Sequence, residues 1–328
     1  MSEQGLQSPS FDQAAAAYHR AVGMAVSGDS VRRVTEGWGA QLEERRQQEV
    51  TRVYEPQGEG GAAMEGPIAI VEPLGERGNL STDGTMILLR QEGWKEVKLT
   101  VISQVEVRPA SERPTTIALR GEDPWVRLRG HSCQAGLWDA DTMGGYQYVE
   151  GLRRGVEHCP CLTSVNDAAP WIERITTENF PQAVQIVDWG HAKAHLYQVA
   201  QEVFGEGEAQ GQAWAKAQEE RLWQGQALGV AEEIAALSSA GDKSRQAQGF
   251  FTTNQRRMQY ARFRAAGYPI GSGTVESGGK NYVQRRLKRP GPGWNRPTAQ
   301  AMLAALSELH SGRFDLAWRR QPHPTILR

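Results

Sequence analysis

The sequence predicts an α/β protein with a helical region at its N-terminus and a second helical segment inserted after its strands. Strands and helices alternate between residues 162 and 204, two segments between residues 79 and 103 have the pattern of strands, and residues 205–249 are rich in alanine, glutamate and glutamine. A chain of 328 residues is long enough for one large domain or two ordinary ones.

Residues 1–55 are expected to be helical. Residues 14–25 are rich in alanine, and residues 31–53 are highly charged. Residues 55–67 contain four glycines and are predicted to be a linker. We therefore expect a helical N-terminal region with its linker over residues 1–67, and one larger domain over residues 68–328.

The next part of the chain favours strands. Residues 79–89 and 94–103 are predicted strands, because Val97, Leu99 and Val101 alternate with polar residues. A helix is expected over residues 138–156. Asp83 then lies within or just after the first strand.

The middle of the chain alternates more regularly. Strands are predicted over residues 162–165 and 183–187, and helices over residues 170–178 and 191–204. This order and spacing indicate parallel strands joined by right-handed crossovers. Residues 205–255 are then predicted to be an all-helical insertion, in which Val230, Ile234 and Leu237 recur at helical spacing.

The composition excludes several classes of protein. Hydrophobic residues make up 39% of the chain and charged residues 23%, as in ordinary globular proteins. The chain contains no apolar run of about 18 residues and does not begin like a secretion signal, so we expect no membrane association. Three cysteines are few and odd in number, which favours a reducing, cytoplasmic location.

The net charge of −1 conceals a strong asymmetry. Residues 250–328 hold 2 lysines and 12 arginines against 1 aspartate and 2 glutamates, a formal charge of +11, so the preceding residues carry −12. A basic region rich in arginine favours binding to a polyanion, because the guanidinium fork matches phosphate. The alternative is a basic face that serves solubility or pairs with the acidic part.

Four carboxylates occupy positions that suit a metal site. Asp167 and Asp188 follow the two predicted parallel strands, where ligands bind in open α/β sheets. Asp83 belongs to an earlier strand, and Glu276 follows a glycine-rich bend and lies in the first turn of a predicted helix. Mg²⁺ prefers oxygen ligands, which carboxylates from separate elements could supply together. Two such ions promote in-line displacement at phosphorus.

Each carboxylate also has a purely structural interpretation. Asp83 could form an Asp-Gly turn, Asp167 and Asp188 could cap helices, and Glu276 could pair with Lys280 at i,i+4. From the residues alone, either Asp167 or Asp188 could be the second acid of a metal site.

Other motifs are weaker. His191 and His195 have the i,i+4 spacing of zinc ligands but lack the adjacent glutamate of a metalloprotease, and pairing of His191 with Asp188 is preferred. Gly271-Ser-Gly273 lacks the ending of a phosphate-binding loop, so no nucleotide cofactor is expected. Trp294 could stack on a base, although a role in the core is preferred.

These motifs together resemble those of bacterial insertion-sequence transposases of the DDE type, in the branch related to Mutator-like elements. The matching segments are Asp83-Gly-Thr, Asp167-x-x-Pro-Trp-Ile, Asp188-Trp-Gly-His191-Ala and Tyr268-Pro-Ile-Gly-Ser-Gly-Thr-Val-Glu-Ser277. The resemblance extends from about residue 80 to residue 318. It implies a ribonuclease-H-like mixed sheet flanked by helices and interrupted by a helical insertion before the last acid.

The resemblance also implies the chemistry. Asp83, Asp167 and Glu276 would be the catalytic acids that hold two Mg²⁺ or Mn²⁺ ions, and Asp188 and His191 would support them without binding metal directly. Cleavage of a phosphodiester would leave a 3′-OH that attacks target DNA. The implied partners are the element ends and target DNA, bound by a homo-oligomer associated with the nucleoid. The residues expected to bind DNA are Arg256, Arg257, Lys280, Arg285, Arg286, Lys288 and Arg289.

The sequence departs from the family pattern in three places. Ala168 stands where the family has glycine, and Gly278-Gly279 occupies a stretch where cysteine is common. About 80 residues precede Asp83, fewer than expected for a full terminal-repeat-binding region. The second hypothesis is therefore a truncated, non-catalytic transposase remnant that binds DNA.

Overall fold

The computed structural model describes residues 1–54, 68–114, 123–237, 241–289 and 293–320. The predicted linker over residues 55–67 lies outside these ranges. Five strands form a mixed sheet in the order β3-β2-β1-β4-β5, and helices flank it. The structure is thus a mixed α/β protein, as the sequence predicts. None of the helices in the described ranges combines the length and the apolar character needed to cross a membrane.

The chain divides into two compact units. The first unit comprises Met1–Gln104, Gly130–Pro160 and Gly273–Arg328, and the second comprises Val105–Arg129 and Cys161–Ser272. Strand β2 (Gly93–Arg108) and strand β3 (Trp125–Gly136) each contribute residues to both units.

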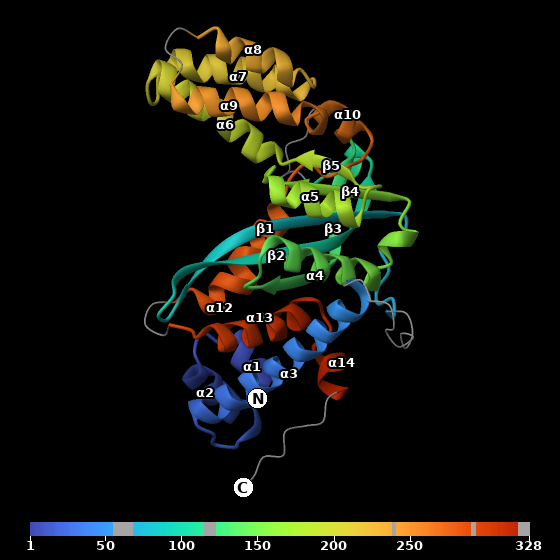
Figure 1. Ribbon diagram of the computed structural model, residues 1–328, viewed down its shortest axis with the longest axis vertical. Helices are drawn as coiled ribbons and strands as arrows, with labels where there is room; N and C mark the ends of the chain where they lie inside the picture. Colours follow the sequence, from blue (N-terminus) through green and yellow to red (C-terminus); the bar gives the residue numbers. More distant parts are fainter. Residues whose placement is uncertain (55–67, 115–122, 238–240, 290–292, 321–328) are drawn as a thin grey trace, which may run out of the picture. The chain divides into compact units, whose positions relative to one another are not determined.

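The first unit contains the N-terminal helices, the antiparallel strands and the C-terminal helices (Figure 1). Its helices are α1 (Ser2–Gln7), α2 (Phe11–Val22), α3 (Gly28–Tyr54), α4 (Ala140–Arg153), η2 (Val156–His158), α11 (Gly273–Gly278), η4 (Gly279–Gln284), α12 (Arg285–Leu287), α13 (Arg296–His310) and α14 (Phe314–Arg319).

Strand β1 (Arg77–Leu89) pairs antiparallel with β2, with Asp83 opposite Leu99. Helix α4 contacts one face of β1, where Gln147 donates a hydrogen bond to Thr82 Oγ1 at 3.0 Å. The run α11–η4 packs against β1 and contributes Val275 to the same buried cluster as Leu99. Strand β1 is therefore covered by helices on both faces.

The expected N-terminal helices form and pack against the C-terminal part of the chain. Trp38 on α3 is 1% exposed and lies edge-on to Phe314 and Trp318 of α14. A Cβ atom added at Gly39 would lie 2.2 Å from the backbone oxygen of Ala301 on α13, so only glycine permits this close approach. These contacts make the N-terminal helices part of the first unit's core.

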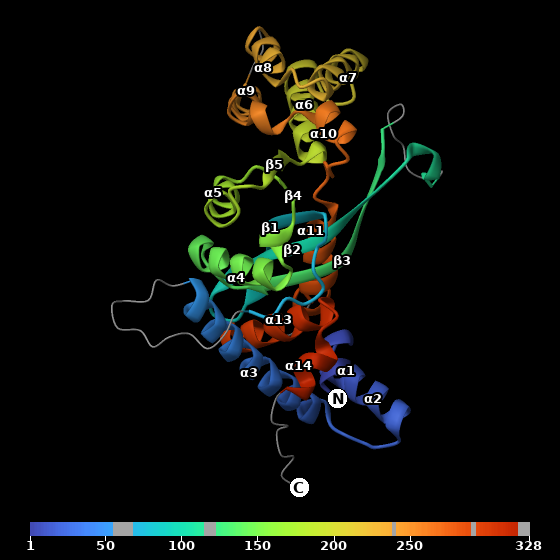
Figure 2. The ribbon, with the colours of Figure 1, turned by 90° about the vertical axis from the view of Figure 1, so that its right-hand side faces the viewer.

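The second unit combines two parallel strands with a group of helices, seen from a second side in Figure 2. Its elements are η1 (Ala110–Glu112), β4 (Cys161–Asn166), α5 (Pro170–Asn179), β5 (Val184–Val187), α6 (Trp189–Phe204), α7 (Ala209–Trp223), α8 (Ala227–Ala235), α9 (Asp242–Asn254), η3 (Gln255–Arg257) and α10 (Tyr260–Ala265).

The strands and helices expected between residues 162 and 204 are all present, with bounds that differ by at most two residues. Helices α7, α8 and α9 occupy the segment predicted to be a helical insertion. Their buried core includes Val230 and Ile234, the residues that recur at helical spacing, and Phe251. Leu237 is only partly buried at the edge of that cluster.

Candidate active site

Two candidate acids end neighbouring parallel strands of the second unit. Asn166 of β4 is paired with Val187 of β5, so Asp167 and Asp188 follow at the same edge. The backbone N–H of Asp188 donates to the carbonyl of Asn166 at 2.7 Å and continues the pairing past the strand end. The predicted placement of both aspartates at the carboxyl edge is confirmed.

Asp188 is an N-cap and a buried anchor. It is 4% exposed, and its Oδ1 accepts hydrogen bonds from the backbone N–H of His191 at 2.6 Å and from the ring Nδ1 of His191 at 3.0 Å. Its Oδ2 accepts from the backbone N–H of Ser272 at 2.6 Å. The predicted capping role and the predicted pairing with His191 are both confirmed.

These hydrogen bonds keep Asp188 ionised. Burial alone would raise the pKa of its carboxyl group, but the hydrogen bonds from His191 and Ser272 outweigh burial and lower it. Engagement of Nδ1 also orients the imidazole of His191 and directs its other nitrogen, Nε2, away from Asp188. The ring itself is 47% exposed.

The sequence marks the glycine-rich bend around Ser272 but does not predict the contact that Ser272 makes. The carbonyl of Ile270 accepts from the N–H of Trp189 at 2.9 Å, and the N–H of Ser272 donates to Asp188, so residues 270–272 bind along the first turn of α6. Ser272 directly precedes α11, which carries Glu276 in its first turn. Glycines on both sides of Ser272 were the available signal for such a close backbone approach.

Asp167 has a different environment. It is half-buried, and its Oδ1 accepts from the N–H of Ala169 at 3.0 Å. The N-cap of α5 is Ala169, with Pro170 at the start of the helix, so the expectation that Asp167 caps this helix is wrong by two residues. Within the described residues, no hydrogen bond reaches Oδ2 of Asp167.

The residue after Asp167 adopts a backbone conformation that favours glycine. Ala168 has a φ of 73°, in the left-handed region. A β-carbon makes this conformation unfavourable by roughly 1–2 kcal/mol. Ala168, where the family that the sequence resembles has glycine, therefore occupies a position whose backbone conformation favours glycine.

Asp83 and Glu276 belong to the first unit. Asp83 lies inside β1 and is paired with Leu99, so the alternative of an Asp-Gly turn is wrong. Paired residues of antiparallel strands project from the same face, and Leu99 projects into the cluster that contains Val275 of α11. Asp83 therefore projects from the face of β1 on which the helix of Glu276 packs.

The position of α11 against this face depends on glycine. A Cβ atom added at Gly278 would lie 3.0 Å from Leu99 Cδ2 and 3.3 Å from Val101 Cγ2. Gly278 thus permits the helix of Glu276 to pack closely on β2, whereas a Cβ atom at Gly279 would make only an ordinary contact with Thr85 of β1. Glu276 itself is half-buried, at an intermediate exposure that suits a ligand-binding carboxylate.

The structure divides the seven predicted DNA-binding residues into different environments. Arg256 is exposed, whereas Arg257 forms an ion pair with Glu173 at 3.0 Å, and both lie in the second unit. In the first unit Arg286 is 5% exposed. The other four predicted DNA-binding residues of the first unit are exposed: Lys280, Arg285, Lys288 and Arg289.

Two further motifs have structural roles. Trp294 is 7% exposed, belongs to the core of the first unit and lies edge-on to Phe11 at 6.2 Å, so the preferred core interpretation is confirmed. His195 packs against Phe250 with ring centroids 4.0 Å apart. Burial, and next the charge of His191, lower the pKa of His195.

No protein-family model matches this chain, and no curated protein matches it.

Proposed function

We propose that this protein is a DDE-type DNA transposase that cleaves and joins phosphodiesters, with a ribonuclease-H-like catalytic fold. The observation that carries the proposal is the pair of aspartates at the ends of the parallel strands β4 and β5. Asp167 retains an oxygen without a hydrogen-bond partner among the described residues, while Asp188 is committed to the fold. A ligand-binding acid beside a supporting acid is the arrangement that the sequence resemblance implies.

The donor atoms fit hard divalent cations. Asp83, Asp167 and Glu276 supply carboxylate oxygens, the preferred ligands of Mg²⁺ and Mn²⁺. Such ions would supply Lewis acidity at the scissile phosphate and at the attacking and leaving oxygens. Asp83 and Glu276 have support within the first unit, since the face of β1 that carries Asp83 is the face on which α11 packs.

The residues of this chain would then have distinct tasks. Asp83, Asp167 and Glu276 would bind the ions. Asp188 would orient the imidazole of His191 and hold Ser272, the residue directly before the helix of Glu276.

A second ligand set serves as the alternative within this proposal. Asp188, His191 and Glu276 are residue types that could share one metal ion. Asp188 already accepts three hydrogen bonds and retains only one of about four acceptor sites, whereas Oδ2 of Asp167 accepts none among the described residues, so Asp167 is the better placed ligand. We therefore assign Asp167 as the second catalytic acid.

The test is cleavage of supercoiled plasmid DNA by the full chain with Mg²⁺ or Mn²⁺, beside a chelator control. Parent protein should nick the plasmid, and Asp83→Asn, Asp167→Asn and Glu276→Gln should each abolish nicking while leaving DNA binding intact. Asp315→Asn, an exposed acid in the first turn of α14, is the matched control and should nick normally. A folded parent that binds DNA but never nicks it would favour the non-catalytic, DNA-binding alternative.

A further inference from the structure

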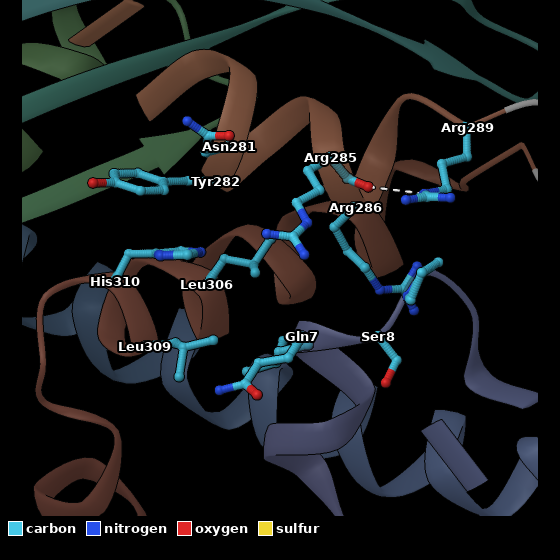
Figure 3. A pocket seen from close by; sticks show the side chains of 12 residues that line it. Gln7, Ser8, Asn281, Tyr282, Arg285, Arg286, Arg289, Leu306, Leu309 and His310 are labelled. Carbon is cyan, nitrogen blue, oxygen red and sulfur yellow. Dashed lines mark hydrogen bonds between the residues drawn. The ribbon is translucent and has the colours of Figure 1, made fainter. Parts of the chain in front are cut away.

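The first unit contains a cationic pocket that the proposed catalytic site does not use (Figure 3). Its volume is about 180 Å³, and its walls come from the end of α1, from the run η4–α12 and from α13. Three arginines line it, Arg285, Arg286 and Arg289, and the described lining includes no aspartate or glutamate. A pocket with three guanidinium groups and no acid is suited to an anion.

Arg286 is the buried part of this pocket. It is 5% exposed, its Nε donates to the carbonyl of Gly5 at 3.0 Å, and its guanidinium lies over the rings of Phe11 at 4.4 Å and Trp294 at 5.0 Å. Its Nη2 has no acceptor among the described residues. Burial, and next the charge of Arg289, lower the pKa of Arg286 to about 10.

A second buried arginine of the same unit shows what a purely structural arrangement looks like. Arg313 is 7% exposed and donates to Glu150 at 2.8 Å and to Glu308 at 3.0 Å. Those two carboxylates raise the pKa of Arg313 despite its burial. Arg286 forms no such ion pair in the described structure. The charge of Glu36 attracts it without forming an ion pair, and burial outweighs that attraction, so the pKa of Arg286 stays lowered.

Arg289 and the stacked rings of Tyr282 and His310 form further parts of the pocket wall. The Nε of Arg289 donates to the carbonyl of Arg285 at 3.0 Å, the dashed line in Figure 3, and holds Arg289 beside the pocket. Tyr282 and His310 stack with ring centroids 4.0 Å apart. Burial, and next the charge of Arg285, lower the pKa of His310 to about 4, so this ring is neutral at pH 7.

We propose that this pocket binds one phosphate group, with Arg285, Arg286 and Arg289 as its ligands. Guanidinium groups bind phosphate oxygens through paired, charge-assisted hydrogen bonds. The cation of Arg286 is already desolvated in the folded protein, so an incoming anion gains the interaction without that cost. The phosphate belongs either to a nucleic acid or to a small molecule, and the proposal stands whether or not the carboxylates cleave DNA.

The first experiment is calorimetric titration of the full chain with inorganic phosphate, in chelator and at constant ionic strength, with chloride as the reference anion. The double variant Arg285→Gln/Arg289→Gln should weaken phosphate binding about tenfold or more, because two charge-assisted hydrogen bonds are lost. Lys280→Gln/Lys288→Gln removes the same charge from the same segment at positions outside the pocket lining, and should change affinity less than about twofold.

A second experiment identifies the source of the phosphate. If a short single-stranded oligonucleotide displaces bound phosphate, and the arginine double variant weakens both ligands, the pocket binds a nucleic-acid phosphate. If phosphate binds and the oligonucleotide does not displace it, the ligand is free phosphate or a phosphorylated small molecule.

The proposal is overturned if phosphate gives no more heat than chloride, or if the lysine and arginine double variants weaken binding equally. Because the titration contains no divalent cation, its result is independent of nicking activity. Failure of the phosphate site is therefore distinguishable from failure of the transposase proposal.

Discussion

Asp167 and Asp188 occupy equivalent positions and have opposite environments. Each follows the last residue of a parallel strand, and the two strands are paired up to that point. Asp188 is buried and accepts three hydrogen bonds, whereas Asp167 is half-buried and accepts one. The comparison teaches that the edge of a sheet brings acids together, while local hydrogen bonding decides which acid supports the fold and which can bind a ligand.

The largest expected difference is in catalysis. Removing a residue that supports a metal site without binding the ion typically costs about 10–100-fold, so we expect a loss of that size in metal-dependent nicking for Asp188→Ala. Asp167→Ala should cost more, because it removes a proposed ligand itself. The measurement is the initial nicking rate against Mg²⁺ concentration. If Asp188→Ala abolished metal binding while Asp167→Ala preserved it, the roles of the two aspartates would be reversed.

The two substitutions should rank in the opposite order in their effect on stability: Asp188→Ala should destabilise the protein more than Asp167→Ala. Asp188→Ala leaves the N–H groups of His191 and Ser272 without their acceptor, and we expect a loss of about 3 kcal/mol in the free energy of unfolding. Asp167→Ala removes one hydrogen bond in a half-buried setting and should cost about 1 kcal/mol. Urea denaturation of both variants measures the difference. Equal losses would show that the hydrogen bonds of Asp188 do not anchor the turn.

The pH dependence of stability sharpens the same contrast. The folded-state pKa of Asp188 is below its ordinary value of 3.8, so its ionised form is stabilised by folding. That contribution is fully present above the unfolded-state pKa and is lost as the pH falls through the lower, folded-state pKa. Asp188→Asn should therefore reduce the slope of stability against pH in acid. A slope identical to that of the parent would contradict this role.

The smallest expected effect concerns the residue between Asp167 and α5. Ala168→Gly should relieve the left-handed conformation and stabilise the protein by about 1 kcal/mol, although greater freedom of the unfolded chain offsets part of the gain. The thermal midpoint measures it. Ala183→Gly, in the loop before β5, is the matched control: Ala183 is likewise half-buried, does not have a positive φ and caps no helix, so no such gain is expected there. A gain in both variants would argue against backbone strain at Ala168.

Much of the second unit could be predicted because its signals are local. The strand and helix pattern between residues 162 and 204 depends on periodicity and on helix start signals, which are properties of neighbouring residues. The capping role of Asp188 and its bond to His191 span three residues, so the sequence suffices for them as well. The sequence shows only that Ala168 departs from the glycine of the family it resembles. The positive φ, which explains why glycine suits this position, is known only from the structure.

The first unit shows what could not be predicted. Arg286 lies among other basic residues and was expected to face DNA, yet it contacts Gly5, Phe11 and Trp294. Its burial depends on an N-terminal helix and a C-terminal tryptophan that are distant in the sequence. Charge patterns identify a basic region but do not distinguish its exposed members from its buried ones.

The sequence by itself determined the fold class, the order of the central elements and the acids worth testing, because hydrophobic period and turn chemistry act over a few residues. Only the tertiary structure decided that Asp188 holds Ser272, that Asp83 projects from the face of β1 covered by α11, and that Arg286 is a buried cation beside a pocket. These facts depend on contacts between residues that are from 84 to 281 positions apart. Such contacts are set by the packing of the whole unit, so they cannot be predicted from any single segment of the chain.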